Sequence, residues 1–342
     1  MFNPKYTISN KLLANIKRIT GLIVDLNNRS FSDVVLVELE KRAREISAFS
    51  STSIEGNPLP LTDVKMILKN KPEHVRDSEK EVLNYNKALV DLNVLINAGK
   101  VVFNTGLILK IQKTITDGLI EKYRCGQIRQ ESVFVNNPKT RQTIYLPPEQ
   151  SDVTSLLDEL FNYLSENKNI VDPLILAGLF HKQFVIIHPF IDGNGRTARL
   201  ATKILLTQMG LDTFNLFSFE NYYNQNVSKY FQEVGILGNY YDIKDEIDFT
   251  SWLEYFTDGI IDELLRVGKE LDKESVSPER ELKEHHQKII NYAKEKGYIT
   301  DREYSKLTKR AKPTRNLDFR KLIERGIIEK IGKGKATYYK LK

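Results

Sequence analysis

The sequence is poor in cysteine: Cys125 is the single cysteine among 342 residues. One cysteine excludes an internal disulfide and a cysteine-rich zinc site, and it fits a reducing cytoplasm. Long apolar runs are also missing, because no segment approaches the ~20 residues that a membrane-spanning helix needs. The first residues, MFNPKY, show no signal-peptide pattern. We therefore expect a cytoplasmic protein that does not cross a membrane.

Charge of both signs is common, but it is unevenly placed. The chain has 51 basic and 45 acidic residues, a net charge of +6. Gly297 to Lys342 carries 14 basic and 5 acidic residues, so the rest of the chain has a net charge of −3. The apolar fraction of 41% is ordinary for a globular protein. The basic character therefore belongs to the C-terminal segment.

The most informative stretch, HPFIDGNGRTAR, runs from His188 to Arg199 between two apolar, helix-like segments. Gly193 and Gly195 let the backbone come close to a ligand. The amides at the start of the following helix form an anion site. Arg196 and Arg199 lie one helical turn apart, and their guanidinium groups suit phosphate oxygens. The stretch therefore predicts a polyphosphate site.

The same stretch offers acid–base and metal chemistry. Asp192 supplies an oxygen ligand of the kind that Mg²⁺ takes when it also contacts phosphates. His188 has an ordinary pKa of about 6.5, which suits proton removal near neutral pH. A polar turn between two helices is the alternative interpretation, but it does not explain this combination of side chains at these spacings.

These residues match every position of the Fic motif, H-x-F-x-[D/E]-G-N-G-R-x-x-R, so the chain resembles the Fic family. The resemblance implies a nucleotidyltransferase that moves AMP from ATP to a Ser, Thr or Tyr hydroxyl of a target protein. Mg²⁺ would be the cofactor, with Mn²⁺ as an alternative. The implied roles are His188 as the base, Asp192 as the metal ligand, Phe190 as a buried anchor, the amides of Gly193, Asn194 and Gly195 as the anion hole, and Arg196 and Arg199 as phosphate ligands.

A second, shorter motif lies upstream, at the end of a helix predicted from about Ser32. Ser51, Glu55 and Gly56 match the inhibitory motif of Fic proteins, [S/T]-x-x-x-E-[G/N]. A carboxylate near a helix C-terminus is unfavourable without a partner. The resemblance implies that Glu55 pairs with Arg199, takes the place of the γ-phosphate and inhibits the enzyme in cis. The alternatives are a solvated Glu at a frayed helix end and a Glu that positions water for the removal of AMP.

The periodicity of apolar residues predicts a mainly α-helical protein with one β-hairpin. We expect an N-terminal helical region over 1–100 with the inhibitory motif at 51–56, a Fic catalytic domain over 101–268, a linker over 269–280, and a winged helix-turn-helix domain over 281–342. The hairpin, within 128–146, resembles the flap of Fic proteins, which holds the target segment by main-chain pairing.

Some residues of the expected helix after Phe219 resemble those that line the adenine and ribose pocket in relatives: Asn224, Tyr230 and Phe231. Core packing explains the two aromatic residues equally well. His181 precedes His188 by about two helical turns, but no HExxH pattern is present. We therefore interpret His181 as a packing or hydrogen-bonded histidine.

The C-terminal segment resembles a winged helix with a basic recognition helix. That helix is expected to expose Arg315, Asn316, Arg320 and Lys321, and the wing to carry Lys333 and Lys335. DNA binding follows from the charge, and a protein-docking module with a solvated basic face is the alternative.

These features leave further functions and partners open. One alternative function is a DNA-binding transcriptional regulator whose Fic part senses nucleotide, and another is UMP transfer on the same scaffold. Because relatives often form dimers, the resemblance also predicts a homodimer.

Overall fold

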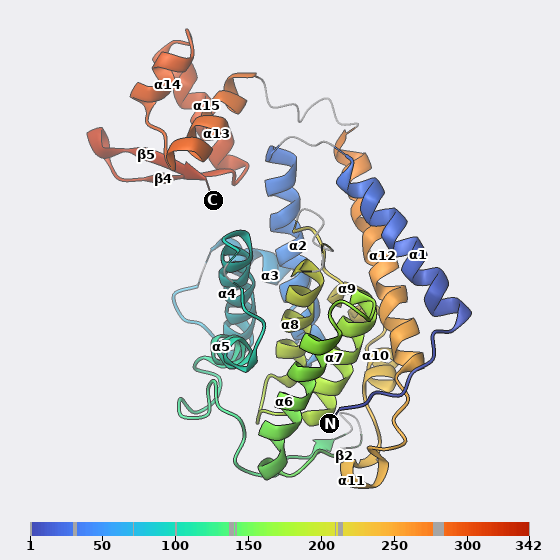
Figure 1. Cartoon of the computed structure of the whole chain (residues 1–342). Coiled ribbons are helices and arrows are strands. Elements are labelled where there is room, and N and C mark those ends of the chain that lie inside the picture. Colours follow the sequence, from blue (N-terminus) through green and yellow to red (C-terminus); the bar gives the residue numbers. More distant parts are fainter. Residues whose placement is uncertain are drawn as a thin grey trace. The chain divides into compact units, whose positions relative to one another are not determined.

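The computed structural model of the chain describes residues 2–29, 33–70, 72–99, 101–136, 140, 142–208, 210, 215–275 and 284–341. The chain divides into two compact units, one of residues 1–29 and 43–267, the other of residues 30–42 and 268–342. The protein is mainly helical, with 65% of the described residues in helices, as the apolar periodicity predicts. Figure 1 shows the order of the elements.

The helices are α1 (Asn10–Asn27), α2 (Asp33–Ile54), α3 (Leu61–Lys69), α4 (Asp77–Asn97), α5 (Thr105–Thr116), α6 (Gln150–Asn167), α7 (Pro173–Ile187), α8 (Asn194–Gln208), α9 (Glu220–Gln225), α10 (Val227–Val234), α11 (Tyr240–Ile243), α12 (Thr250–Ser275), α13 (Glu284–Lys296), α14 (Asp301–Leu307) and α15 (Lys312–Glu324). The strands are β1 (Val135–Asn136), β2 (Thr143–Leu146), β3 (Gly238–Asn239), β4 (Ile328–Ile331) and β5 (Tyr338–Leu341), and a short 3₁₀ turn, η2 (Gly334–Ala336), lies between the last two.

Helix α7 is the central element of the first unit. It begins at Pro173, where Asp172 caps the helix by accepting from the amide of Leu174 at 2.9 Å. Nearly all of its residues are buried, which is the pattern of a helix covered on every side. Trp252 of α12 donates its indole N–H to the carbonyl of Gly178 at 2.7 Å. The buried tryptophan is therefore part of the core.

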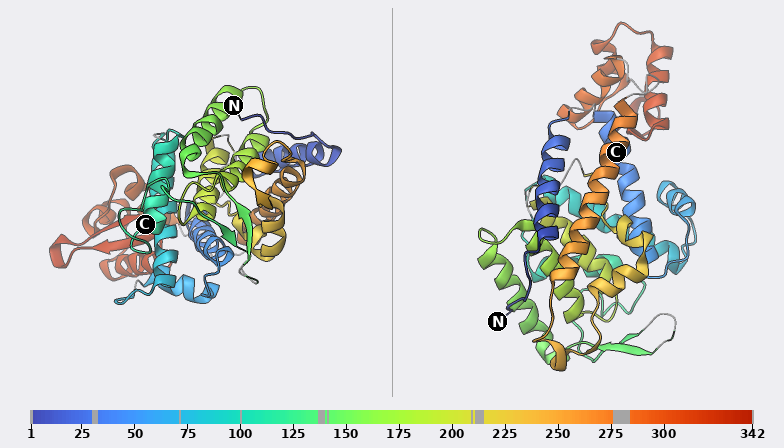
Figure 2. Two further views of the ribbon diagram at one scale, coloured as in Figure 1. Left: turned by 90° about the horizontal axis from the view of Figure 1, so that it is seen from below. Right: turned by 90° about the vertical axis from the view of Figure 1, so that its right-hand side faces the viewer.

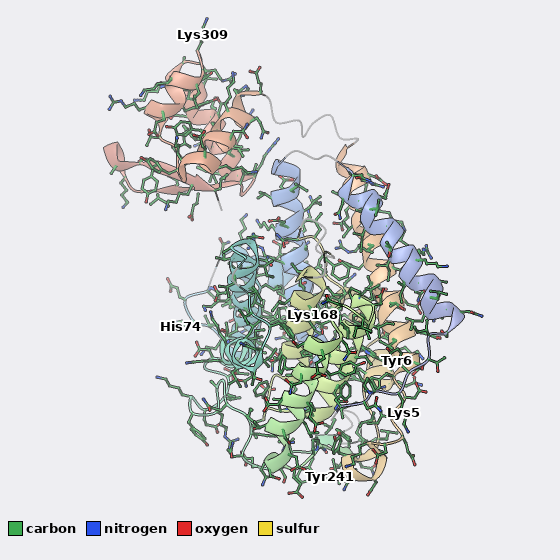
Figure 3. All side chains as sticks on the ribbon, viewed as in Figure 1. Lys5, Tyr6, His74, Lys168, Tyr241 and Lys309 are labelled. Atoms are coloured by element: carbon green, nitrogen blue, oxygen red, sulfur yellow. The ribbon has the colours of Figure 1, made fainter. Side chains whose placement is uncertain are left out.

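The predicted hairpin is present, but it is short. β1 pairs antiparallel with β2, and β2 pairs in parallel with β3 to make a three-stranded sheet; the hairpin is visible in the right-hand view of Figure 2. Tyr241 of α11, labelled in Figure 3, donates to Asp152 at 2.6 Å and accepts from the amide of Glu149 at 3.0 Å. These bonds tie the end of the sheet to α6. Residues 137–139 and 141, at the tip of the hairpin, lie outside the described residues.

Within the second unit, residues 284–341 form three helices, α13 to α15, followed by the antiparallel hairpin of β4 and β5. Its own core consists of Ile289, Ile290, Ala293, Ile299, Tyr304, Phe319, Leu322, Ile327, Ile328 and Tyr339. A separate core is what an independently packed unit requires.

Some boundaries differ from the prediction. Residues 269–275 are helical, because α12 continues to Ser275, and were expected to be linker; residues 276–280 lie outside the described part of the chain. Residues 1–29 and 43–100 pack with the central helices in one unit, so the predicted region 1–100 is not a separate body. Long-range packing of this kind leaves no mark in local periodicity. Among the described residues, no helix has the length and apolarity that a membrane crossing requires.

Candidate active site

The turn between α7 and α8 places His188 at the end of a buried helix. His188 is the C-cap of α7 and adopts the left-handed conformation, with φ 51° and ψ 59°. This conformation is uncommon for a residue with a side chain, and it persists where surrounding bonds hold it. Arg129 supplies such bonds: its Nε donates to the His188 carbonyl at 2.8 Å and its amide donates to the Pro189 carbonyl at 3.0 Å. Arg129 therefore fixes the backbone on which the imidazole stands.

The loop that follows is closed by Asn194. The amide of Phe190 donates to Asn194 Oδ1 at 2.9 Å, and Asn194 Nδ2 donates to the Phe190 carbonyl at 2.8 Å. Phe190 is fully buried, which agrees with its expected role as an anchor. Gly193 has a φ of 81°, and a Cβ there would lie 3.1 Å from Ile115. Glycine is thus required at this position by both conformation and space.

The start of α8 has the geometry of an anion site. The amide of Thr197 donates to the Gly193 carbonyl at 2.9 Å, which is the i to i−4 bond between the first turn of α8 and the preceding loop. The amides of Asn194, Gly195 and Arg196 precede it, where helix amides have no intrahelical acceptor and the helix dipole is positive. The expected anion hole therefore coincides with a helix N-terminus.

A carboxylate from the upstream motif lies at this site. Arg199 Nη2 donates to Glu55 Oε1 at 2.6 Å, and the Arg199 side chain is fully buried. A Cβ added to Gly195 would overlap Glu55 Oε1, so the acid rests against the glycine of the helix start. Ser51 contributes as well: its hydroxyl accepts from Arg199 Nε at 2.8 Å and its carbonyl accepts from Nη2 at 2.9 Å. The structure thus brings Ser51 and Glu55 together with Arg199, and the acid near the end of α2 has the partner that its position requires.

Arg196 is held by two carboxylates. Its Nη2 donates to both oxygens of Asp192 at 3.0 and 2.9 Å, and its Nη1 pairs with Glu81 of α4 at 2.7 Å. Glu81 Oε2 also accepts from Asn57 Nδ2 at 2.7 Å. Because Asn57 follows Glu55 and Gly56, Glu81 links the turn after α2 to the first arginine of the motif. Neither Glu81 nor Asn57 is predicted from the sequence, since no periodicity connects these distant segments.

The environment of His188 favours its neutral form. Burial lowers the pKa of the imidazole to about 4, although the Val185 carbonyl acts in the opposite direction. Nδ1 lies 3.3 Å from that carbonyl. If Nδ1 carries the proton, Nε2 remains as the acceptor. A neutral imidazole with an open nitrogen is what a general base needs.

His181 is structural, as the sequence analysis predicts. Its Nδ1 lies 3.0 Å from Thr202 Oγ1, and its Nε2 lies 3.0 Å from the Tyr230 hydroxyl. The ring is fully buried, and burial holds its pKa well below the ordinary value. Tyr230 also accepts from Arg199 Nη1 at 3.3 Å, so this buried chain of bonds ends at the second motif arginine.

The residues expected near adenine lie in different surroundings. Tyr230 is buried and stacks on Tyr223 with ring centroids 4.6 Å apart, which favours the packing interpretation for its ring. Phe231 is 41% exposed, and Asn224 of α9 is partly exposed. The structure therefore separates the two aromatics into a core residue and a surface residue.

Two buried side chains, those of Tyr145 and Arg129, connect the hairpin region to the backbone near His188. The Tyr145 hydroxyl of β2 donates to the Ile186 carbonyl at 2.8 Å. Arg129 Nη1 donates to the Glu131 carbonyl at 3.1 Å, and its Nη2 donates to the Pro148 carbonyl. Arg129 therefore connects the residues on either side of the hairpin, Glu131 and Pro148, to the backbone of His188.

In the second unit, most of the residues expected on the recognition helix and the wing are exposed. Asn316, Arg320, Lys321 and Lys333 are exposed. Arg315 is not: its Nε and Nη2 donate to the carboxylate of Asp301 at 2.8 and 2.9 Å. Arg315 was expected on the exposed face of α15, and an intramolecular ion pair takes it instead. The side chain of Lys335 lies outside the described part of the structure.

Comparisons with known proteins agree with this geometry. The profile of the Fic/DOC family matches residues 102–206. The chain is 27% identical over 228 residues to protein adenylyltransferase Fic of Culex quinquefasciatus, which covers 61% of this chain and 43% of that protein. It is 28% identical over 228 residues to protein adenylyltransferase Fic of Drosophila erecta, covering 59% of this chain and 43% of that protein. The chain therefore spans less than half the length of these relatives.

Solved structures share the fold. A Fic family protein from Desulfovibrio desulfuricans G20 has a TM-score of 0.65 at 21% identity and covers 100% of this chain and 98% of its own. Fic-1 from C. elegans has a TM-score of 0.60 at 20% identity and covers 77% of this chain and 73% of its own. Residues 102–206, which contain the α7–α8 site, thus match the Fic/DOC family profile, and the chain is a distant homologue of the Fic protein adenylyltransferases.

Proposed function

We propose that this chain is a protein adenylyltransferase that moves AMP from ATP to a Ser, Thr or Tyr hydroxyl and is inhibited in cis by Glu55. The observation that carries the proposal is the contact of an internal carboxylate with Gly195 and Arg199 at the start of α8. A site that holds one anion against a helix N-terminus is suited to another, such as a phosphate group.

The reaction follows from the proposed base and the anion site. Nε2 of neutral His188 takes the proton of the target hydroxyl as the hydroxyl oxygen attacks the α-phosphorus of ATP. The new oxygen–phosphorus bond forms while the bond between the α-phosphorus and the bridging oxygen breaks, and pyrophosphate leaves. Arg196, Arg199 and the amides of α8 stabilise the charge on the β- and γ-phosphates, which is the main catalytic contribution in reactions of this type.

Asp192 fits the proposed Mg²⁺. Its side chain is 44% exposed. Both carboxylate oxygens accept from the Nη2 atom of Arg196. Mg²⁺ takes carboxylate and phosphate oxygens together, and Mn²⁺ accepts similar ligands. When bound, the ion would neutralise phosphate charge. The role of Asp192 would be to hold the ion beside the phosphates, with Arg196 released toward the nucleotide.

Inhibition follows from competition for Arg199. Glu55 pairs with the guanidinium group of Arg199, which would otherwise bind the γ-phosphate. A triphosphate can therefore bind only with its phosphates shifted from the reactive position, or after the turn at Gly56 has moved Glu55 away. The same carboxylate could direct a water molecule, which keeps removal of AMP as an alternative activity. Transfer of UMP is a second alternative, because the described contacts concern phosphates and not the base.

The target segment is proposed to pair with the 128–146 hairpin. β2 already bonds to β1 and β3, so the edges of this sheet among the described strands are those of β1 and β3. Extended peptides add to such strand edges through main-chain bonds. Arg129 joins this segment to His188, so a peptide on the hairpin would be positioned relative to the base. The proposed partners are therefore ATP, a target protein and a second copy of the chain, all within the cytoplasm.

DNA binding by the second unit is the second candidate function. Asn316, Arg320, Lys321 and Lys333 are exposed on α15 and the hairpin, as the proposed winged helix requires. In this alternative the Fic part senses nucleotide. Leu317 on the same helix is 51% exposed, which suits the alternative of protein docking.

Salt dependence separates these alternatives. We expect duplex DNA binding by the full chain to weaken with salt, and the doubly substituted Arg320→Ala/Lys321→Ala protein to lose about two units of the logarithmic salt slope. The control Lys87→Ala removes an exposed lysine of α4 and should leave the slope unchanged. Equal slopes in all three proteins would exclude α15 as a DNA-reading helix.

The test of the proposed reaction uses ATP labelled at either the α- or the γ-phosphate, in the Glu55→Gly background. We expect protein labelling from the α-label alone, its loss in His188→Ala, and full retention in the control His74→Ala, which changes an exposed loop histidine. Labelling from the γ-phosphate would indicate phosphorylation and contradict the proposal.

A further inference from the structure

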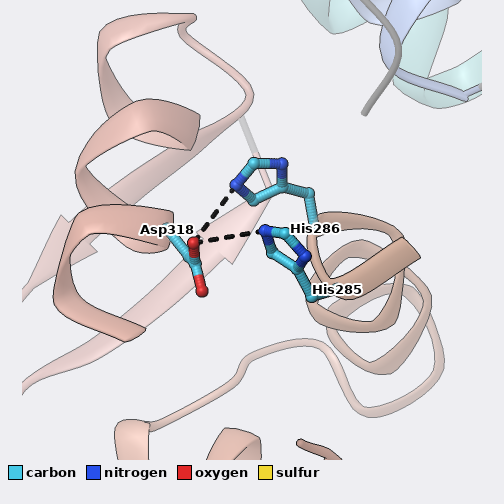
Figure 4. A group of neighbouring side chains, drawn as sticks. All are labelled: His285, His286 and Asp318. Atoms are coloured by element: carbon cyan, nitrogen blue, oxygen red, sulfur yellow. Dashed lines mark ion pairs between the residues drawn. The ribbon is translucent and has the colours of Figure 1, made fainter. Parts of the chain in front are cut away.

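The second unit contains a compact group of two histidines and one aspartate that the proposed function does not use. His285 and His286 lie in the first turn of α13, and Asp318 lies in α15. The ligand-type atoms of the three side chains all lie within 4.8 Å of one another. Figure 4 shows both imidazole rings facing the same carboxylate. The three side chains are 15%, 7% and 3% exposed.

Ordinary hydrogen bonds do not explain this arrangement. Nε2 of His285 lies 3.4 Å from Asp318 Oδ1, and Nε2 of His286 lies 3.5 Å from the same oxygen. These separations exceed the ~2.7–3.2 Å of a normal hydrogen bond. Neither ring nitrogen of His286 has a hydrogen-bond partner, and the residue is buried, with only 5% of its surface exposed. A buried polar group without a partner calls for an explanation such as an ion.

The separations match those between ligands of one tetrahedral ion. Zinc–nitrogen and zinc–oxygen bonds are about 2.0–2.1 Å long. Two such bonds at a tetrahedral angle place their ligand atoms about 3.3–3.4 Å apart. The two nitrogen–oxygen distances in the cluster are close to this value. The third separation, between the ligand atoms of the two histidines, is within 4.8 Å, so rotation of the imidazole rings would complete the contact of both with one ion.

The second carboxylate oxygen of Asp318, Oδ2, bonds to two neighbouring side chains, as the outer-shell partners of a metal ligand do. Oδ2 accepts from the Tyr304 hydroxyl at 2.9 Å and pairs with Arg310 Nε at 2.9 Å. Arg310 Nη2 also approaches Oδ1, at 3.3 Å. Partners of this kind orient a carboxylate that binds a metal through its other oxygen.

The nearby positive charge limits which ion would bind and how tightly. Arg310 contacts the carboxylate, and Lys321 and Arg325 lie close enough to act on His286 electrostatically. Nitrogen ligands disfavour Mg²⁺ and Ca²⁺, whereas Zn²⁺, Co²⁺ and Ni²⁺ bind imidazole well. The site therefore suits a nitrogen-preferring transition-metal ion of moderate affinity.

We propose that His285, His286 and Asp318 bind one Zn²⁺ or similar divalent transition-metal ion, which joins α13 to α15. A water molecule would complete the four ligands. The ion would link the first helix of the second unit to the helix that carries the exposed basic residues. Its role is structural and does not depend on the proposed AMP transfer.

Calorimetric titration of the full chain with Zn²⁺, after removal of metals with a chelator, tests the proposal. We expect one equivalent to bind and the affinity to fall at least about tenfold in His285→Gln and in His286→Gln, since even the loss of outer-shell support costs that much. The control His74→Gln should bind like the wild type. Tetrahedral Co²⁺ absorption in the wild type, absent from both variants, provides a second signal.

Two outcomes would overturn the proposal. The first is no saturable binding of Zn²⁺ by the wild-type chain. The second is equal binding by the wild type and by a His285→Gln/His286→Gln double variant that keeps its helical circular dichroism, because that result places the ion elsewhere. His285 is the more exposed ligand, so its variant serves if the His286 variant unfolds. Self-labelling with ATP should be the same in all of these proteins.

Discussion

Replacing Glu81 by Gln tests whether the turn after α2 is anchored through Arg196. Glu81 pairs with Arg196 at 2.7 Å and accepts from Asn57 at 2.7 Å, and the paired side chains are 15% and 6% exposed. Breaking a fully buried ion pair costs about 3–5 kcal/mol. Asp192 keeps its contacts with Arg196, whereas the charged acceptor of Asn57 is lost, so we expect a loss of about 2 kcal/mol.

Chemical and thermal denaturation measure this loss. For a unit of this size, 2 kcal/mol corresponds to a fall in Tm of about 4–8 °C. The control Asp91→Asn removes a carboxylate from the same helix, where Asp91 forms an exposed pair with Lys87 at 3.0 Å, and it should change stability by less than about 0.5 kcal/mol. Combining Glu81→Gln with Asn57→Ala should cost less than the sum of the single changes by at least about 0.5 kcal/mol, because the two side chains share one bond.

The same variants have a predicted effect on labelling. Because Asn57 and Glu55 belong to one turn, loss of the bond between Asn57 and Glu81 should weaken the ion pair between Glu55 and Arg199. Glu81→Gln and Asn57→Ala should therefore raise self-labelling when Glu55 is present and leave it unchanged in the Glu55→Gly background. A Glu81→Gln protein as stable as Asp91→Asn, with effects that add to those of Asn57→Ala, would refute the reasoning.

Two further predictions concern the two histidines of α7 and its C-cap. Because desolvation lowers the pKa of His188 to about 4, the neutral base persists below the ordinary imidazole pKa. We therefore expect kcat/KM of the Glu55→Gly enzyme to fall on the acid side near pH 4 and not near about 6.5; an acid limb at the higher value would contradict the lowered pKa of the base. Tyr230→Phe removes the hydroxyl that contacts His181 and Arg199, and equilibrium unfolding should show a loss of about 1–3 kcal/mol from the unsatisfied buried groups, whereas Phe231→Leu, on the exposed neighbour, should cost much less.

The parts of the site that lie close together in the sequence could be predicted from it. His188, Asp192, the glycines and the two arginines fall in one short stretch, where spacing alone places them on a loop and the first turns of a helix. Asp172 and Pro173 likewise predict the start of α7, because a capping acid followed by proline is a local signal.

What could not be predicted depends on contacts between distant segments. Arg129 supports the backbone of His188, and Glu81 holds Arg196, yet neither side chain belongs to a periodic pattern that reveals its partner. Arg315 was expected to be exposed on α15, but the acid that binds it, Asp301, lies in another helix. The extension of α12 through 269–275 shows that a charged composition alone does not identify a linker, since charged residues are good helix formers.

Self-labelling with ATP labelled at the α-phosphate, in wild type and Glu55→Gly side by side, tests the central claim most directly. Removal of the carboxylate that contacts Arg199 at 2.6 Å frees the proposed γ-phosphate site, and a coupling of ordinary size would raise labelling by about 5–150-fold. We predict this rise together with tighter ATP binding. Unchanged labelling and unchanged ATP affinity in the Glu55→Gly protein would contradict it.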